Sequence, residues 1–245
     1  MIAKAEREQI IALINREVVP AIGCTEPIAV ALGVAKATET LGCKPEKIQA
    51  LLSANILKNA MGVGIPGTGS IGRPIAIALG ALTGKSEYQW EVLKDSTPEA
   101  VEAGKKLIDS QAINIGLKYG IEEKLYIEII CEAEGKKATA IISGGHTNFV
   151  YVAHGEEVLV NKQAASSNEA TSDDVELTLR KVYDFAMETP IEELKFILET
   201  RNLNKQAAER SFKGNYGHQL GKTLNSKKNE NLMMGDNTFT HILSY

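Results

Sequence analysis

The chain has 245 residues, of which 44% are hydrophobic and 24% are charged, a composition typical of a folded globular protein. These values exclude an intrinsically disordered chain, and the length suffices to bury a core in one large domain or two small ones. A formal net charge of -4 leaves no basic excess for nucleic acid or anionic lipid, so we expect neither as a partner.

The sequence favours a cytoplasmic protein without a membrane span. Its longest apolar run, residues 74–82, is far shorter than the roughly 20 residues that cross a bilayer. The first 19 residues mix charges among apolar positions and predict an amphipathic helix rather than a signal peptide. The cysteines are odd in number and widely spaced, which suits a reducing compartment: Cys24, Cys43 and Cys131.

The first 85 residues favour helices. A helix rich in small residues is predicted from Pro27 to Leu41, and Gly42 is its natural end. Pro45 is predicted to begin a third helix with apolar positions up to Met61. A glycine-rich loop and a fourth, very apolar helix over 73–82 follow.

The middle of the chain favours strands. Residues 87–93, "EYQWEVL", alternate polar and apolar side chains and predict a half-buried strand. Thr97 and Pro98 then begin a helix. Further strands are predicted in "AINIGLK", "KLYIEIICEA", "ATAIIS", "NFVYV" and "EVLV", and the turn "AHGEE" joins the last two as a hairpin. These features indicate an antiparallel sheet.

Helical patterns return beyond residue 165. We therefore predict an α+β fold with a discontinuous helical domain, residues 1–85 and 165–245. An antiparallel-sheet α+β unit, residues 86–164, is inserted into it.

Two glycine-rich segments, "GVGIPG" at 62–67 and "GTGSIG" at 67–72, match the spelling GxGxxG. That motif binds dinucleotides only between a strand and a helix, and the preceding segment has helical periodicity, so we do not expect a nucleotide site. Glycine also permits tight turns. A third reading has the backbone N–H groups around Gly67, with Thr68 and Ser70, binding a small anion such as a carboxylate.

Two polar clusters have both a structural and a functional interpretation. Asn55, Lys58 and Asn59 share a face of the predicted third helix, where they either bind a substrate carboxylate and amine or are a solvated lysine and structural amides. His146 and Asn148, in "SGGHTNF", follow a strand and two glycines. A histidine there either moves protons or is only a turn residue.

Cys24 in "IGCTEP" lies just before a predicted helix. Thr25 is a candidate N-cap and Pro27 suits the first turn, so the sulfur would lie where the helix dipole favours an anion. Such a position is expected to lower the pKa of the thiol and make it a base, a nucleophile or a metal ligand. Glu26 offers a second proton acceptor. Packing as a small apolar side chain is the alternative.

Four segments together resemble the L-cysteine desulfidase group of the serine dehydratase alpha-chain superfamily. They are "EVVPAIGCTEPIAVALG", "SANILKNAMGVGIPGTG", "GGHTNFVYV" and "NLMMGDNTFTHILSY". Each piece is short, but the resemblance spans essentially the whole chain and the combination is specific.

This resemblance implies a lyase without pyridoxal phosphate. It removes hydrogen sulfide from L-cysteine by α,β-elimination and uses a 4Fe-4S cluster as Lewis acid. Cys24 is then the candidate base or cluster-proximal metal ligand, Glu26 a second catalytic group and His146 a residue that orients the substrate. The candidate substrate-binding residues are Asn55, Lys58, Asn59, Gly67, Thr68 and Asn148.

Members of that family continue past the stretch that resembles Tyr245 into a segment whose cysteines hold the cluster. We therefore expect this chain to fold as a fragment that binds no cluster, has little activity and exposes apolar surface through which it could form a homo-oligomer. L-serine dehydration and amino-acid binding without chemistry remain alternative functions, because cysteine and serine share their carboxylate and amine.

Overall fold

The fold of the chain is α+β, as predicted. The computed structural model describes residues 2–20, 24–59, 73–162, 175–215 and 219–227. Two compact units make up the chain. The sheet unit is Val19–Ser172, and the helical unit is Met1–Val18 with Asp173–Tyr245.

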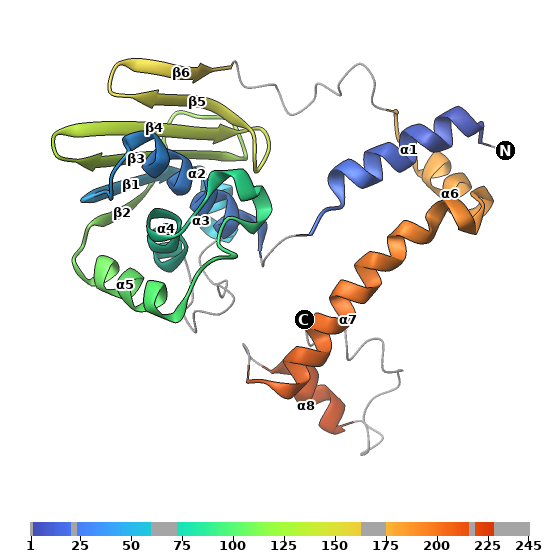
Figure 1. Cartoon of the computed structure of the whole chain (residues 1–245). Coiled ribbons are helices and arrows are strands. Elements are labelled where there is room, and N and C mark those ends of the chain that lie inside the picture. Colours follow the sequence, from blue (N-terminus) through green and yellow to red (C-terminus); the bar gives the residue numbers. More distant parts are fainter. Residues whose placement is uncertain (1, 21–23, 60–72, 163–174, 216–218, 228–245) are drawn as a thin grey trace. The chain divides into compact units, whose positions relative to one another are not determined.

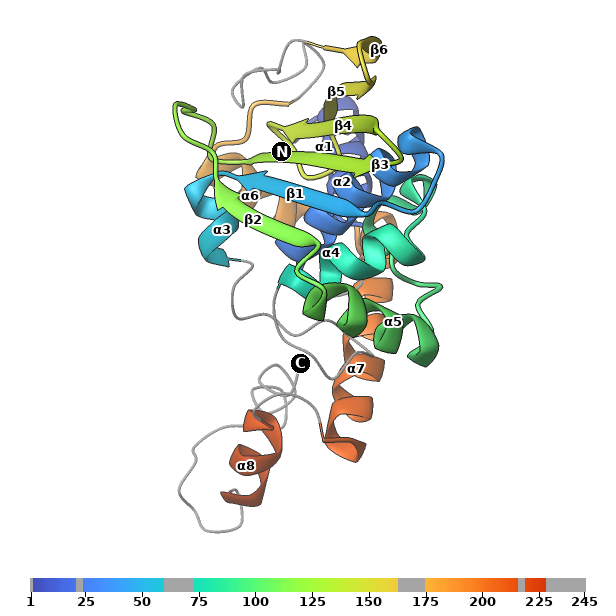
Figure 2. The same cartoon turned by 90° about the vertical axis from the view of Figure 1, so that its left-hand side faces the viewer.

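A six-stranded sheet is the centre of the sheet unit (Figures 1 and 2). The strands are β1 (Lys47–Leu52), β2 (Ile113–Leu117), β3 (Tyr126–Ala133), β4 (Lys136–Ser143), β5 (Phe149–His154) and β6 (Glu157–Asn161). They lie in the order β2-β1-β3-β4-β5-β6, and neighbours are antiparallel except for the parallel pair β1 and β2. The predicted hairpin between β5 and β6 is present, and Gly155 at its turn has a φ of 59°.

Helices cover the sheet in layers. The helical elements are α2 (Thr25–Leu41), α3 (Ala54–Asn59), α4 (Arg73–Leu82), the 3-10 helix η1 (Ser86–Glu91) and α5 (Pro98–Asp109). Helix α2 packs on β3, β4 and β5, α4 packs on α2, and α5 packs on α4. Because α2 has neighbours on both sides, it is apolar almost all round and most of it is fully buried.

Small residues let these layers approach closely. A Cβ atom at Gly33 of α2 would lie 3.0 Å from Cγ1 of Ile129 on the sheet. On the other side of α2, a Cβ atom at Gly80 of α4 would lie 2.6 Å from the backbone oxygen of Ala31. The glycine and alanine content of these helices therefore sets the spacing between the layers.

The helix predicted over 45–61 is wrong in its first half, which forms β1. Ile48, Ala50 and Leu52 are buried on alternate positions, and the strand pairs on both sides, with β2 and β3. The apolar residues of this segment fit both a period of 2 and a helical period, and pairing with two neighbours decides for the strand. Only the later residues, in α3, are helical.

The strand predicted over 87–93 is also wrong, because residues 86–91 form η1. Gln89 has a φ of 50° and a ψ of -116°, which kinks the backbone between two short turns. Val92 is fully buried and Trp90 packs partly against the core. The alternation in the sequence thus reflects core contacts made from turns that pack on α2, not a strand.

The helical unit joins the two ends of the chain. Its elements are α1 (Lys4–Glu17), α6 (Leu179–Glu188), the 3-10 helix η2 (Ile191–Ile197), α7 (Leu198–Lys213) and α8 (Leu220–Lys227). Its core consists of Ile2, Ile10 and Phe185 with a few partly buried neighbours. Arg7 and Glu193 form two hydrogen bonds, of 3.0 and 3.1 Å, between α1 and η2.

The two units differ from the predicted domains. The terminal segments do share one unit, but residues 25–82, which were predicted to belong to the helical domain, pack on the sheet. The reason is that β1 lies inside the sheet and α2 covers it, so neither can be separated from residues 86–164. Within the described ranges, no helix is long and apolar enough to cross a membrane.

Candidate functional site

A hydrogen-bonded cluster lies at the N-terminus of α2. The Cys24 thiol donates to Oε2 of Glu26 at 3.0 Å, and the Thr25 hydroxyl donates to the same oxygen at 3.1 Å. Nδ2 of Asn59, at the end of α3, donates to the other carboxylate oxygen at 3.2 Å. Both oxygens of Glu26 therefore accept hydrogen bonds, and two helices remote in sequence meet at this carboxylate. We call Cys24, Glu26 and Asn59 the thiol–carboxylate cluster.

Glu26 is a carboxylate at neutral pH. Burial acts to raise the pKa of Glu26, but the hydrogen bonds donated by Cys24, Asn59 and Thr25, together with a backbone hydrogen bond, outweigh it and lower the pKa below its usual value. Among the described residues, neutral hydrogen-bond donors stabilise this charge.

The expected low pKa of Cys24 is wrong. Burial raises the pKa of the thiol, and the hydrogen bond to the Glu26 carboxylate raises it further because it favours the protonated sulfur. Cys24 is the N-cap of α2, and backbone hydrogen bonds from this helix end act in the expected direction but are the smaller effect. The resting cluster therefore holds a neutral thiol beside an anionic carboxylate.

His146 lies near this cluster in the turn between β4 and β5. Its ring contacts Trp90, with centroids 5.5 Å apart and planes at 46°. Burial lowers the pKa of His146. The negative charge of Glu26 acts in the opposite direction, so the imidazole and this carboxylate interact electrostatically. With a net lowered pKa, His146 is neutral at pH 7 and can accept a proton.

Asn148 shapes the turn that presents His146. Its Nδ2 donates to the backbone oxygen of Ser143 at 3.0 Å, and its backbone N–H donates to that of Gly145 at 3.2 Å. The Ser143 N–H in turn donates to the Asn148 oxygen at 3.2 Å. These contacts give Asn148 a structural role, and its predicted substrate contact stays a prediction.

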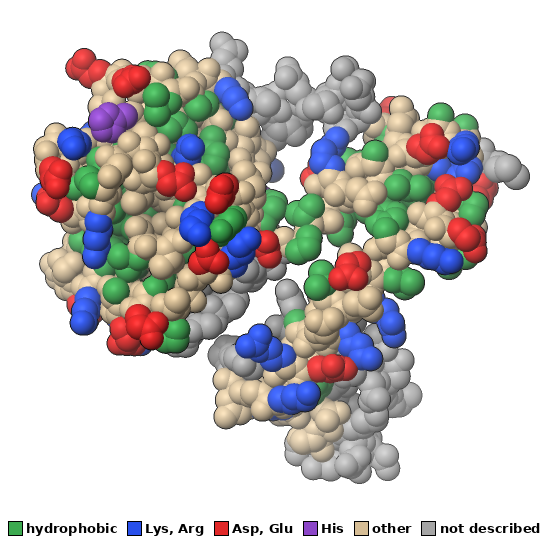
Figure 3. Space-filling view, in the orientation of Figure 1, with side chains coloured by type: hydrophobic (Ala, Val, Ile, Leu, Met, Phe, Trp, Pro, Cys, Tyr) green, Lys and Arg blue, Asp and Glu red, His purple; other side chains and the backbone are tan. Residues whose placement is uncertain are grey.

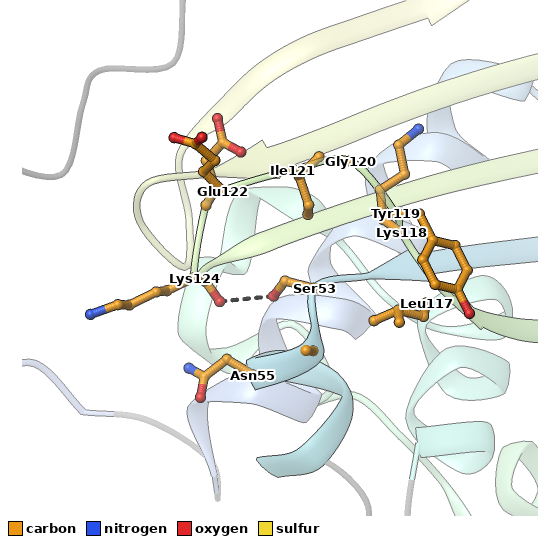
Figure 4. A pocket seen from close by; sticks show the side chains of 11 residues that line it. Ser53, Asn55, Leu117, Lys118, Tyr119, Gly120, Ile121, Glu122 and Lys124 are labelled. Atoms are coloured by element: carbon orange, nitrogen blue, oxygen red, sulfur yellow. Dashed lines mark hydrogen bonds between the residues drawn. The ribbon is translucent and has the colours of Figure 1, made fainter.

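The other two polar residues of α3 do not join the cluster. Asn55 and Lys58 are exposed, and Asn55 lines a separate open cavity of about 340 Å³ between the start of α3 and residues 117–124 (Figure 4). The Ser53 hydroxyl at its base donates to the backbone oxygen of Lys124 at 2.8 Å. Of the three residues predicted to share one face, only Asn59 reaches Glu26.

Gly67 and Thr68, predicted to bind the substrate carboxylate, lie outside the described residues.

Of the remaining cysteines, Cys131 is fully buried on β3 with its sulfur 3.8 Å from the Thr38 hydroxyl, and burial raises its pKa to about 11. The described residues contain no group of three or more histidine, cysteine or acidic side chains placed to hold a metal. The cluster thus offers at most one thiolate, which does not fit a complete iron-sulfur site.

Neither Trp90 nor the contact between Asn59 and Glu26 could be placed at this site from the sequence. Trp90 read as one apolar position of a strand, and its contact with His146 depends on the kink at Gln89. The sequence shows that Asn59 is polar but not which residue it contacts. Its partner, Glu26, lies 33 residues earlier in the chain and is brought near by the pairing of β1 in the sheet.

By sequence, the chain is similar to UPF0597 proteins. It is 76% identical over 245 residues to a UPF0597 protein of Phocaeicola vulgatus and 72% identical over 242 residues to one of Bacteroides fragilis. Another UPF0597 protein, from Porphyromonas gingivalis, is 46% identical over 245 residues.

All of this chain is matched by the P. vulgatus protein, but it spans only 57% of the length of that relative and 56% of the two others. No family model matches the chain, and no solved structure matches it. The comparisons therefore show a likeness to UPF0597 proteins, and the chemistry must be argued from the site.

Proposed function

We propose that this chain is part of an amino-acid lyase that removes hydrogen sulfide from L-cysteine by α,β-elimination, giving pyruvate and ammonia. The observation that supports this most is the thiol–carboxylate cluster, in which the Cys24 thiol donates to Glu26 at 3.0 Å beside the amide of Asn59. The resemblance to L-cysteine desulfidases independently assigns a catalytic role to the same cysteine.

The cluster can supply the base for this reaction. The reactive form of Cys24 is a minor thiolate, formed when the thiol proton passes along the existing hydrogen bond to Oε2 of Glu26. The raised pKa of the thiol and the lowered pKa of the carboxylate make this transfer unfavourable at rest, and the thiolate that it produces is the stronger base of the two groups. The thiolate removes the α-proton of the substrate, the bond between Cβ and sulfur breaks, and the sulfide leaves with its electron pair. The aminoacrylate that remains hydrolyses to pyruvate and ammonia.

His146 and Asn59 have supporting roles in this proposal. The neutral imidazole of His146 can accept a hydrogen bond from the substrate ammonium group or take up its proton. Asn59 holds the Glu26 carboxylate in place through its second oxygen. Asn55, Lys58, Gly67 and Thr68 remain candidates for the substrate carboxylate.

The 4Fe-4S cluster implied by the resemblance belongs to the whole protein in this proposal. Because the described residues contain no group of three or more side chains placed to hold a metal, we assign the ligands other than Cys24 to the length of the relatives that this chain does not span. The roles proposed for Cys24, Glu26, Asn59 and His146 do not depend on the iron-sulfur cluster.

Sulfide release tests the proposal. The protein to assay is the full-length P. vulgatus relative after anaerobic reconstitution with iron and sulfide, together with a chimera in which the present 245 residues replace the matched part. Both should release sulfide and pyruvate from L-cysteine. In the chimera, Cys24→Ala should abolish turnover, and Glu26→Gln should lower kcat by about 10²- to 10⁴-fold, the usual range for a group that transfers protons.

Other outcomes would reject the assignment. Pyruvate formation from L-serine without sulfide formation from L-cysteine would identify a serine dehydratase. Tight amino-acid binding by calorimetry without turnover would identify a binding protein. Full activity in the Cys24→Ala chimera would remove the physical basis of the proposal.

A further inference from the structure

The helical unit has a very small core for its content of large apolar residues. Among the described residues of this unit, Ile2, Ile10 and Phe185 form its one buried cluster, and Ala208 of α7 is the other buried apolar side chain. Many other large apolar side chains of the unit are exposed: Val18, Leu177, Leu179, Val182, Tyr183, Met187, Ile191, Ile197, Leu198, Leu203 and Leu220. Apolar side chains, green in Figure 3, accordingly reach the surface of this unit between acidic and basic ones.

Four of these side chains form a continuous stripe on α6. Leu179, Val182, Tyr183 and Met187 lie at positions i, i+3, i+4 and i+8, so they share one face of the helix. Leu179 is 88% exposed and Met187 is 67% exposed. Ile191, just beyond the end of the helix, is 72% exposed and extends the apolar sequence. We call these five residues the α6 stripe.

The α6 stripe is distinct from the face of α6 that packs inside the unit. Phe185 points into the small core and is 7% exposed, while Lys181 pairs with Glu6 of α1 at 2.8 Å. On the outside, Arg180 binds Asp184 at 2.9 Å and lies 5.9 Å from the ring of Tyr183. Helix α6 therefore has two apolar faces. One packs in the small core of the helical unit, and the other, the α6 stripe, is exposed and edged by charged side chains.

Exposed apolar surface of this extent, with a charged rim, is typical of an interface. The relatives supply a partner, because the P. vulgatus protein has 43% of its length outside the part that this chain matches. We propose that the α6 stripe is the docking surface for that remaining part of the UPF0597 chain, which presents an apolar face to Leu179, Tyr183 and Met187. This inference does not depend on the proposed lyase chemistry.

Site-resolved labelling tests the proposal. Leu179→Cys and Met187→Cys are introduced separately into the 245-residue chain and into a chimera that adds the unmatched part of the P. vulgatus relative. Maleimide modification is followed peptide by peptide in a mass spectrometer, so that the native cysteines do not interfere. Both positions should react at least tenfold more slowly in the chimera. Glu8→Cys on α1 is the control, because that side chain is 63% exposed and outside the stripe, and its rate should not change.

A second measurement needs neither the cysteine variants nor the chimera. Oxidative footprinting of the full-length P. vulgatus protein, compared with its own matched part, should show protection of the peptide that corresponds to α6. Unchanged labelling in both experiments would overturn the proposal. So would protection that appears in the 245-residue chain alone as its concentration rises, which indicates a second copy, or protection that requires lipid vesicles. Equal slowing at Glu8→Cys would reject the stripe as the specific contact.

Discussion

The close crossing of α2 and α4 makes Gly80→Ala a sharp test of the packing that supports the site. The new Cβ atom would lie 2.6 Å from the backbone oxygen of Ala31 and 3.1 Å from its Cα. The first distance is about 0.8 Å shorter than an ordinary contact. Because the new Cβ atom would clash with backbone atoms of Ala31, helix α4 must move away from α2. Helix α4 packs on the side of α2 that does not face the sheet.

Two effects of opposite sign determine the magnitude. Overpacking of a tight core costs about 1–3 kcal/mol, and contact with backbone favours the upper end. Alanine in place of glycine inside a helix returns about 1 kcal/mol. We therefore expect Gly80→Ala to lower the free energy of unfolding by about 2 kcal/mol. For a unit of this size, that corresponds to a Tm lower by about 4–8 °C.

Chemical denaturation followed by circular dichroism, with Gly104→Ala as matched control, measures this difference. A Cβ atom at Gly104 of α5 would meet side-chain atoms and no backbone atom, with Cδ1 of Ile75 at 3.1 Å and Cβ of Ala78 at 3.3 Å. Since the end of the Ile75 side chain can shift, the helix propensity gain should prevail and the control should be neutral or more stable. Equal effects of the two substitutions would refute the argument from backbone approach.

Three further predictions concern single contacts. The hydrogen bonds from Arg7 lower the pKa of Glu193, so this pair stabilises the helical unit above the ordinary glutamate pKa of 4.5 and its contribution is lost as the pH falls below that value. In Glu193→Gln the acid loss of stability in denaturant titrations should be smaller, and an unchanged loss would contradict the pairing. Asn148→Ala should cost about 1 kcal/mol and shift the NMR signals of His146, because the turn loses its side-chain hydrogen bond; unshifted signals would argue against the turn as the support of the imidazole. Cys131, with a pKa raised to about 11 by burial, should react with maleimide more slowly than the other two cysteines in the native chain, and equal rates would show that β3 is less buried than described.

Local signals in the sequence were reliable where one residue type enforces one geometry. Thr97 and Pro98 begin α5 as predicted, with the threonine hydroxyl accepting a hydrogen bond from the Ala100 N–H at 3.3 Å. Gly42, with a φ of 77°, ends α2 in the left-handed conformation.

Predictions failed where distant residues decide the structure. The β1 segment has apolar residues that suit either period, and its partners β2 and β3 lie more than 60 residues further along the chain. The segment of η1 alternates like a strand but packs on α2 and pairs with no described strand. Tertiary contacts override the local preference in both cases.

The candidate site was predictable in its residue types but not in its electrostatics. Cys24, Glu26 and His146 were singled out as candidates from the sequence, and in the structure the charge of Glu26 acts on the other two. The sequence suggested a helix dipole that would ionise the thiol. Burial and the direct hydrogen bond to Glu26 have the opposite effect, and a hydrogen bond at 3.0 Å is not visible in a pattern of residues.

The hydrogen bond from the Cys24 thiol to the Glu26 carboxylate is the contact on which the proposed chemistry depends most, and the pH dependence of Cys24 alkylation tests it directly. Rates of iodoacetamide modification, resolved by peptide mass spectrometry, give the pKa of each cysteine in the native chain. We predict that the pKa of Cys24 lies above the usual 9.0 and falls in the Glu26→Ala variant, where the acceptor and its charge are absent. A Cys24 pKa below 9.0 that does not respond to Glu26→Ala would contradict the account.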